Sequence, residues 1–134
     1  ETMHSEPPVA DVIVEVANGL RHSVAVASER GVVNAQIVLD IGIGFGKTPQ
    51  QNLELLAKLD KLSSSLEGFP LLVGASRKSF IAKTLGEMPP EERLPASLAA
   101  ATVAVMSVTQ IIRAHDVRET VQAVRLAAAL LEQR

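Results

Sequence analysis

The sequence predicts an α/β fold built on a parallel sheet, in which helices and short strands alternate. Apolar residues at helical spacing alternate with short apolar runs that end near glycine, which is typical of parallel strands joined by helices. The 134 residues are 47% apolar, which is enough to bury a core. Only 2% are aromatic, so the core must consist of Val, Leu, Ile and Ala, as in helices packed on a buried sheet.

The first predicted helix spans Val9 to Glu29, where apolar residues recur at near-helical spacing. Gly31 follows at a position where helix C-termini prefer glycine. The apolar run Ile37–Leu39 then predicts a strand, which leads into Asp40. A loop follows, with glycine at every second position over residues 42–46.

The next unit repeats this order. The pair Thr48-Pro49 resembles an N-cap followed by proline at the first helical position, which predicts a helix that ends near Leu62. The run Phe69–Val73 is a predicted buried strand, with its proline near the start, where strands tolerate it. We expect a short helix from Ser76 to about Leu85.

The last part of the chain begins with a predicted surface turn at residues 87–92. An alanine-rich helix is expected over residues 95–106, and Ile111–His115 is the third predicted strand. Asp116 and Glu119 form a pattern like a capping box, which predicts the start of the final helix. The apolar stripe of that helix comprises Val117, Val121, Val124, Ala128 and Leu131.

One more strand is expected to end at Thr2–His4. With it, the chain holds about four strand-helix units, which is half of the eight in a TIM barrel. Because no internal repeat or low-complexity linker is found, residues 1–134 are expected to form one piece of a single domain.

Composition argues against several classes of protein. The net charge of -2 is spread over both signs, and three Phe with no Tyr or Trp offer few stacking platforms, so we expect no nucleic-acid partner. No apolar run approaches the roughly 20 residues of a membrane span, and the N-terminal residues lack signal-peptide features. The absence of cysteine excludes disulfides and thiolate metal sites. We therefore expect a cytoplasmic protein without a membrane partner.

Functional residues of such a fold gather where strands end and helices begin, and three of these junctions are polar. At the first, Asp40 can accept paired hydrogen bonds from a guanidine-like edge such as that of a pterin, and the glycines allow close backbone approach. Alternatively, Asp40 caps a turn and the glycines satisfy unusual backbone angles. The spacing favours these two interpretations about equally. It matches neither a Walker loop nor a full Rossmann fingerprint.

The second and third junctions are cationic. Arg77 and Lys78 lie beside a helix start, which favours anionic or carbonyl ligands, although a solvated basic turn is the better interpretation of this pair alone. Arg113 and His115 are two residues apart, so they share one strand face. A buried arginine needs a carboxylate of the chain or a ligand anion. On its own, a histidine at such a position is more often a core residue. Together with Arg113 it suits phosphate or pyrophosphate, so we favour a ligand anion as the partner of this pair.

Together the three junctions resemble the dihydropteroate synthase family. Leu39–Lys47 is similar to that family's Asp-Pro-Gly-Ile-Gly-Phe-Gly-Lys loop, and Val73–Phe80 to its Gly-x-Ser-Arg-Lys segment. Ile112–Val117 resembles its Arg-Val-His-Asp-Val strand. Order and spacing also agree across most of the chain, and the alanine-rich helix at Ser97–Ala101 fits between the motifs.

The resemblance implies the C-terminal half of a TIM barrel. It further implies a transferase that condenses 6-hydroxymethyl-7,8-dihydropterin pyrophosphate with 4-aminobenzoate in folate biosynthesis. By the same resemblance Lys78, Arg113 and His115 are the catalytic residues. The implied substrate-binding residues are Asp40 and Lys78 for the pterin, Phe45 and Ser79 for aminobenzoate, Arg113 and His115 for pyrophosphate, and Gly44, Gly74 and Arg77 in the same loops. Magnesium is implied too, but its usual asparagine has no counterpart, so no metal ligand is assigned.

Departures from the family pattern leave alternatives open. Ile41 replaces a proline, the segment Met3–Pro8 differs from the family's Met-His-Met-Arg-Gly, and nothing corresponds to the first half of the barrel. We expect this chain alone to be inactive, and to form a homodimer or associate with a missing N-terminal half. One alternative is a non-catalytic homologue that acts as a pterin-binding or assembly module. Another is the pterin-binding domain of a folate-dependent methyltransferase, which the second and third motifs argue against.

Overall fold

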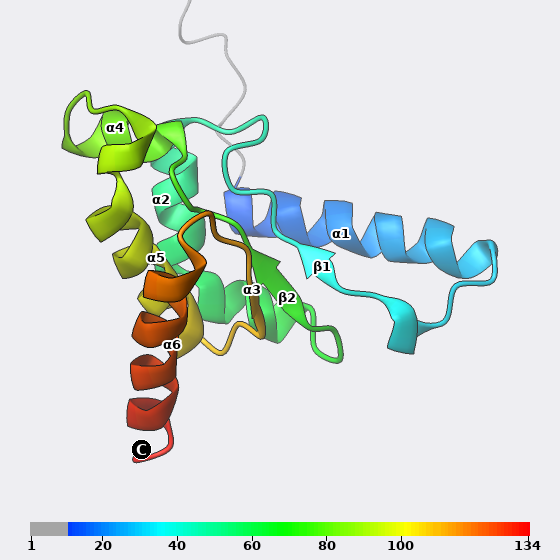
Figure 1. The fold of residues 1–134 in the computed structure, drawn as a ribbon. Coiled ribbons are helices and arrows are strands. Elements are labelled where there is room, and N and C mark those ends of the chain that lie inside the picture. Colours follow the sequence, from blue (N-terminus) through cyan, green and yellow to red (C-terminus); the bar gives the residue numbers. More distant parts are fainter. Residues whose placement is uncertain (1–10) are drawn as a thin grey trace, which may run out of the picture.

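The computed structural model describes residues 11–134 and shows the predicted alternation of helices and strands (Figure 1). The expected strand end at Thr2–His4 and the segment Met3–Pro8 lie outside the described residues. In chain order the elements are α1 (Val12–Glu29), η2 (Asn34–Gln36), β1 (Leu39–Asp40), α2 (Pro49–Ala57), α3 (Leu59–Ser65), β2 (Leu71–Val73), α4 (Ser79–Leu85), η3 (Pro90–Glu92), α5 (Leu94–Met106), β3 (Ile111–Ile112) and α6 (Val117–Leu131).

The sheet has the order β1-β2-β3, and both neighbouring pairs are parallel. Leu39 pairs with Leu71, and Leu72 pairs with Ile111. Each strand is connected to the next through helices, which confirms the predicted parallel α/β arrangement. The carboxyl ends of the strands therefore meet at one edge of the sheet, where the three polar junctions follow them.

The strands are shorter than their apolar runs. The predicted strand at residues 37–39 is observed as Leu39–Asp40, and the predicted strand at residues 111–115 as Ile111–Ile112. Apolar runs report burial, whereas strand length depends on how many residues a neighbour can pair. The ladder nevertheless continues by one bond beyond β3, since the Arg113 amide donates to the Val73 carbonyl at 3.0 Å.

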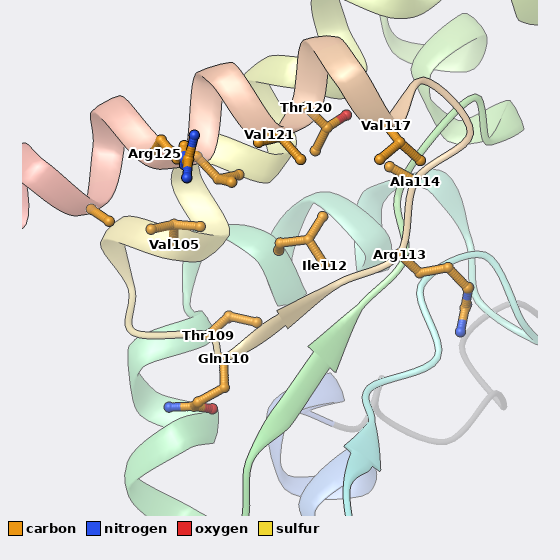
Figure 2. Close-up of a pocket in the computed structure, with 12 residues that line it drawn as sticks. Val105, Thr109, Gln110, Ile112, Arg113, Ala114, Val117, Thr120, Val121 and Arg125 are labelled. Carbon is orange, nitrogen blue, oxygen red and sulfur yellow. The ribbon is translucent and has the colours of Figure 1, made fainter.

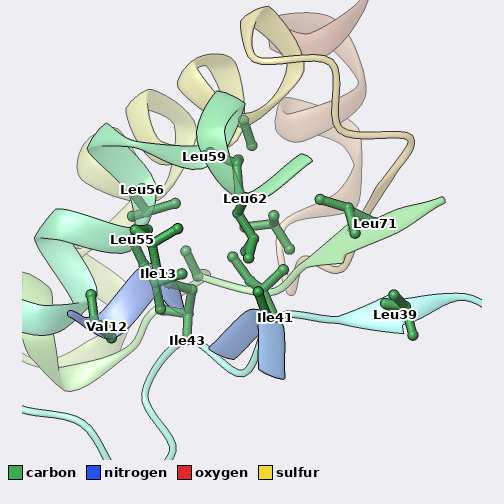
Figure 3. Close-up of a cluster of buried hydrophobic side chains, with 14 of the residues drawn as sticks. Val12, Ile13, Leu39, Ile41, Ile43, Leu55, Leu56, Leu59, Leu62 and Leu71 are labelled. Carbon is green, nitrogen blue, oxygen red and sulfur yellow. The ribbon is translucent and has the colours of Figure 1, made fainter. Parts of the chain in front are cut away.

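The core lies between the sheet and the layer formed by α1, α2 and α3 (Figure 3). Ile41 and Ile43, from the loop after β1, are fully buried in this cluster. The glycine-rich loop is thus anchored by alternate apolar side chains. The largest fully buried side chains are Ile41, Ile43, Leu55, Leu59, Leu62, Leu71 and Val73.

Several helix boundaries differ from the predictions. α1 begins at Val12, because Asp11 is its N-cap and accepts from the Ile13 amide at 2.9 Å. The predicted helix over residues 48–62 is two helices that meet at Lys58, and the helix expected from Ser76 begins at Ser79. The predicted cap and turn at Thr48 and residues 87–92 agree with the structure.

The final helix corrects two predictions. Asp116 is at the N-cap position of α6 but makes no side-chain capping bond, so the predicted capping box is wrong. Much of the predicted stripe is exposed, including Val117 and Val121, whereas the buried residues are Thr120 and Ala127. The small side chains of Thr120 and Ala127 let α6 pack closely against α5 on the buried side of the helix. The valine side instead lines an apolar groove of about 610 Å³ between β3, α5 and α6 (Figure 2).

None of the helices in residues 11–134 combines the length and the hydropathy that a membrane crossing requires.

Candidate functional site

Side chains of the first and third polar junctions contact each other over the backbone of the second junction. Arg113, just after β3, extends away from α6 while Ile112 points toward it, as strand alternation predicts (Figure 2). The Arg113 Nη1 donates to Asp40 Oδ2 at 2.8 Å. A Cβ atom added at Gly74 would lie 2.5 Å from Arg113 Nη2, so the guanidinium crosses directly over Gly74. Glycine at this position is therefore what lets Arg113 reach Asp40.

This ion pair corrects our expectation of a buried arginine that needs a ligand anion. The side chains of Arg113 and Asp40 are 50% and 41% exposed, so solvent screens both charges. Burial alone would raise the pKa of Asp40. The hydrogen bonds from Arg113 and the Gly42 amide, together with the charges of Arg113 and Lys78, outweigh it, so the pKa of Asp40 lies below its ordinary value. Asp40 is therefore an ionised acceptor at neutral pH.

The loop after β1 is folded around its own backbone. The Gly42 amide donates to Asp40 Oδ1 at 2.9 Å, and Lys47 Nζ donates to the carbonyls of Gly42 and Phe45 at 2.7 and 3.0 Å. Gly42, Gly44 and Gly46 all have positive φ, between 63° and 88°, a region that other residues rarely adopt. Asp40 thus forms the turn that one interpretation predicted, without losing its exposed carboxylate edge.

Asn52, which was not among the predicted site residues, binds the backbone of this loop through its side chain. Asn52 on α2 is only 3% exposed, and its Oδ1 accepts from the Gly44 amide at 2.9 Å. A polar residue four positions after Thr48, on the side of the helix that carries Leu55 and Leu56, was the available signal. Buried amides of this kind need a partner, and here the partner is the backbone of the functional loop.

Lys78 joins the second junction to the first. Its Nζ donates to the Ile43 carbonyl and lies 4.7 Å from the centroid of the Phe45 ring. A Cβ at Gly44 would lie 2.9 Å from Lys78 Cδ, so the lysine passes close over the loop backbone. Desolvation and the nearby Arg113 charge lower the pKa of Lys78, although Asp40 opposes the shift.

Arg77 faces the other way. Its Nε and Nη2 donate to Asp116 Oδ2 and Oδ1 at 3.2 and 2.9 Å, a two-bond pair that ties the loop after β2 to the start of α6. Arg77 itself has a φ of 59°. Two residues outside the predicted site hold it there: Ser97 Oγ accepts from its amide at 3.0 Å, and Arg93 Nη1 donates to its carbonyl at 2.8 Å.

A cavity of about 180 Å³ opens at the meeting point of the second and third junctions. Since one water occupies roughly 30 Å³ of liquid, the cavity has room for a phosphate group. Two cations and an imidazole converge on it, which makes it suitable for an anion. Its lining residues are Gly74, Ser76, Lys78, Arg113, Ala114 and His115.

Four predicted site residues therefore share this cavity: Gly74, Lys78, Arg113 and His115. Asp40 adjoins it through Arg113. The other predicted residues lie around it: Gly44 and Phe45 beside Lys78, Arg77 paired with Asp116, and Ser79 exposed at the first position of α4.

Ser76 was not among the predicted residues, although the structure places it at the cavity wall. Its Oγ accepts from the His115 amide at 3.2 Å and lies 3.0 Å from His115 Nδ1. The contact spans 39 residues of sequence, so no local pattern could reveal it.

Over residues 11–134, no group of three or more His, Cys, Asp or Glu side chains is arranged to hold a metal ion. Asp40, which contacts the lining residue Arg113, is already bound by Arg113 and the Gly42 amide. The structure therefore assigns no residue to magnesium, which stays a prediction.

The profile of the family described as "Pterin binding enzyme" matches residues 1–115 of this chain. The chain belongs to the pterin-binding enzyme family. Among members of that family, dihydropteroate synthase of Escherichia coli (strain K12) is 42% identical over 131 residues, which cover 98% of this chain and 45% of that protein. Dihydropteroate synthase of Bacillus subtilis (strain 168) is 36% identical over 131 residues, 96% of this chain and 45% of the relative.

Solved structures of dihydropteroate synthases agree with this assignment to the pterin-binding enzymes. The Yersinia pestis enzyme in a sulfonamide drug complex superposes with a TM-score of 0.88 at 36% identity, over 100% of this chain and 48% of that one. The Coxiella burnetii enzyme in complex with pteroic acid gives a TM-score of 0.87 at 33% identity, over 96% and 48%. The matches confirm the resemblance and the predicted partial TIM barrel. The chain spans about half the length of the relatives it matches.

Proposed function

We propose that this chain forms the pterin-binding and pyrophosphate-binding part of a dihydropteroate synthase. That enzyme is a transferase that joins 6-hydroxymethyl-7,8-dihydropterin pyrophosphate to 4-aminobenzoate and releases pyrophosphate, a step of folate biosynthesis. The observation that carries the proposal is the cavity where Lys78, Arg113 and His115 converge beside the ionised Asp40. Cationic groups that can bind a leaving anion therefore lie next to a carboxylate that can bind a heterocycle edge.

Asp40 is proposed to bind the pterin. Arg113 and the Gly42 amide each occupy one of its oxygens, and every carboxylate oxygen has a second lone pair. Two adjacent N–H groups of a pterin can use these remaining lone pairs. The lowered pKa keeps the carboxylate ionised, so both of its oxygens act as acceptors.

The cationic cavity is proposed to act on the leaving group. As the bond between the exocyclic methylene and the pyrophosphate oxygen breaks, the methylene becomes cationic and the pyrophosphate takes the electron pair. The amine of aminobenzoate then attacks the methylene and loses a proton. Lys78, Arg113 and His115 would stabilise the departing anion, which is electrostatic catalysis without a covalent enzyme nucleophile.

Aminobenzoate is proposed to lie near Phe45 and Ser79. The Phe45 side chain is 65% exposed and its ring lies beside Lys78, so it offers an aromatic surface at the edge of the site. For Arg77 to contact substrate directly, its pair with Asp116 must break. We therefore propose that Arg77 serves the substrate-binding loop mainly by fixing the backbone beside Lys78.

The remaining parts of the proposal rest on the family resemblance, on the composition of the chain and on the incomplete barrel. They are magnesium as cofactor, a homodimer or association with an N-terminal half, and a cytoplasmic location. A second candidate function is a pterin-binding or assembly module without catalysis. Ile41 favours it, because a fully buried isoleucine takes the place of the family's loop proline and the backbone there is held by packing instead of by a ring.

Calorimetry with pyrophosphate and with a 6-hydroxymethylpterin tests the binding roles. Arg113→Ala should weaken pyrophosphate binding about tenfold or more, since it removes a charged donor. Arg118→Ala, on the exposed side of α6, should leave it unchanged. Equal affinity in the two variants would contradict the pyrophosphate role.

A product assay separates the two candidate functions. Dihydropteroate formation that depends on Arg113 supports the synthase. Pterin binding without any product, when the chain is supplied together with the remainder of a synthase barrel, supports the binding module.

A further inference from the structure

We infer that Ser76 is a positioning residue that holds His115 as the neutral tautomer with its proton on Nε2. The ring then offers an uncharged N–H donor to the cavity. The inference deepens the proposed anion site and rests on it for the identity of the anion. The assignment of the tautomer itself depends only on the hydrogen bonds between the two residues.

The hydroxyl of Ser76 has one hydrogen and two lone pairs. One lone pair accepts from the His115 amide at 3.2 Å, and the same oxygen lies 3.0 Å from His115 Nδ1. If Nδ1 carried a proton, the hydroxyl would accept twice and its own hydrogen would have no partner among these groups. Ser76 is only 8% exposed, so that loss would be costly. The hydroxyl therefore donates to Nδ1, which leaves the ring proton on Nε2.

The same contacts orient the ring. Ser76 lies in the loop after β2, whereas His115 lies after β3, and both line the cavity. Two contacts to a single oxygen, one from the backbone and one from the ring, fix both the main chain and the plane of His115. With Nδ1 committed to Ser76, Nε2 is the ring nitrogen that remains for a ligand.

Several charged groups lie on the segments that carry the cavity residues. These groups are Arg77 and Lys78 on the loop after β2, Arg113 and Asp116 on the segment after β3, and Asp40 at the end of β1. Both carboxylates are already paired with guanidinium groups, and Lys78 donates instead to the Ile43 carbonyl. An Nε2–H donor at the cavity would therefore share a bound anion with the Lys78 ammonium and the Arg113 guanidinium.

The test combines two measurements on the 134-residue chain. Nitrogen-15 NMR of the histidine rings at pH 8.0 reports the tautomer of His115 directly. Calorimetry with pyrophosphate, at pH 8.0 and at a lower pH where the same spectra show the ring to be protonated, compares the unchanged protein with Ser76→Ala. Ser23→Ala on the exposed side of α1 is the matched control, and Ser76→Thr keeps the hydroxyl.

We expect the Nε2–H tautomer, and pyrophosphate binding about tenfold weaker in Ser76→Ala at pH 8.0. At a pH where the NMR spectra show the ring to be protonated, the loss should be about twofold or less, because a protonated imidazole donates from both nitrogens whatever its neighbour. Ser76→Thr should recover most of the affinity at pH 8.0, and Ser23→Ala should lose none.

Two results would overturn the inference: an Nδ1–H tautomer in the unchanged protein, or an equal loss at both pH values, which indicates a purely structural serine. The NMR result on the unchanged protein decides the tautomer even if Ser76→Ala fails to fold. Failure of the proposed function looks different. In that case the Nε2–H tautomer is seen, but pyrophosphate does not bind to the unchanged protein at either pH.

Discussion

Gly74→Ala should abolish much of the anion binding while leaving stability nearly unchanged. The added Cβ would lie 2.5, 2.8 and 2.9 Å from Arg113 Nη2, Cζ and Nε, all far inside van der Waals contact. The guanidinium must therefore leave its place over Gly74, and the hydrogen bond to Asp40 breaks. Because the obstructing group is the end of a flexible side chain, the backbone need not move.

The free energy of unfolding should change little, because the lost ion pair and the gained alanine contribute small amounts of opposite sign. An exposed ion pair contributes about 0–1 kcal/mol, and both partners here are roughly half exposed. Gly74 has no positive φ, so alanine fits its backbone and stabilises by about 0.4–1 kcal/mol through the unfolded chain. The net change in the free energy of unfolding should thus stay within about 1 kcal/mol of zero.

The expected change in binding is larger. A hydrogen bond to a charged group contributes about 1.5–3 kcal/mol, so displacement of Arg113 should weaken pyrophosphate binding about tenfold to a hundredfold. Denaturant unfolding and calorimetry on the same samples measure both quantities. Gly19→Ala is the matched control, because a Cβ there meets nothing within 4 Å. It should stabilise α1 by up to about 1 kcal/mol and leave binding unchanged. Pyrophosphate affinity in Gly74→Ala equal to that of the unchanged protein would refute the reasoning.

Three further predictions concern the loop after β1. Asp40→Asn should weaken pterin binding more than stability, because one acceptor oxygen becomes a donor that faces donors; equal pterin affinity by calorimetry would make Asp40 a turn former only. The pKa of Asp40 is lower in the folded protein than its ordinary value of 3.8, so the ionised carboxylate stabilises the fold at any pH above 3.8. This contribution is lost as the pH falls through the pKa of the folded state. The difference in denaturant midpoint between the unchanged protein and Asp40→Asn should therefore shrink below that pH, and a constant difference would contradict the assignment. Asn52→Ala should lower the free energy of unfolding by about 1–3 kcal/mol, because the Gly44 amide loses its acceptor, and it should also weaken pterin binding. Thermal unfolding and calorimetry measure these two effects. An unchanged melting temperature would show that Asn52 does not hold the loop.

The order of elements and the three junctions could be predicted because both depend on local pattern. Helical spacing, strand-ending glycines and polar residues after apolar runs are all visible within about ten residues. Strand alternation likewise placed Arg113 on the opposite side from Ile112, as Figure 2 shows. Once the strands are parallel, their carboxyl ends must share an edge, so the convergence of Arg113 on Asp40 follows from topology.

The details that sequence could not predict depend on partners far along the chain. Asp116 matched a local capping pattern, but its carboxylate pairs with Arg77, 39 residues earlier. A two-bond pair with a guanidinium is stronger than one bond to a backbone amide, so the distant partner prevails. In the same way, the α6 stripe was predicted as core from its spacing. The helix instead buries Thr120 and Ala127, because small residues there permit close packing on α5.

Two arginine-carboxylate pairs in the structure differ in a way that fits the proposed function. Arg77 and Asp116 form two hydrogen bonds and hold the loop after β2 against the start of α6. Arg113 and Asp40 share one hydrogen bond and are more exposed, so breaking that pair costs little. Until a ligand binds, the exposed pair keeps Asp40 ionised and holds both partners near the cavity. In the proposed complex the pterin uses the remaining lone pairs of Asp40 while the pyrophosphate binds Arg113, so the two halves of one substrate contact the two partners of this ion pair.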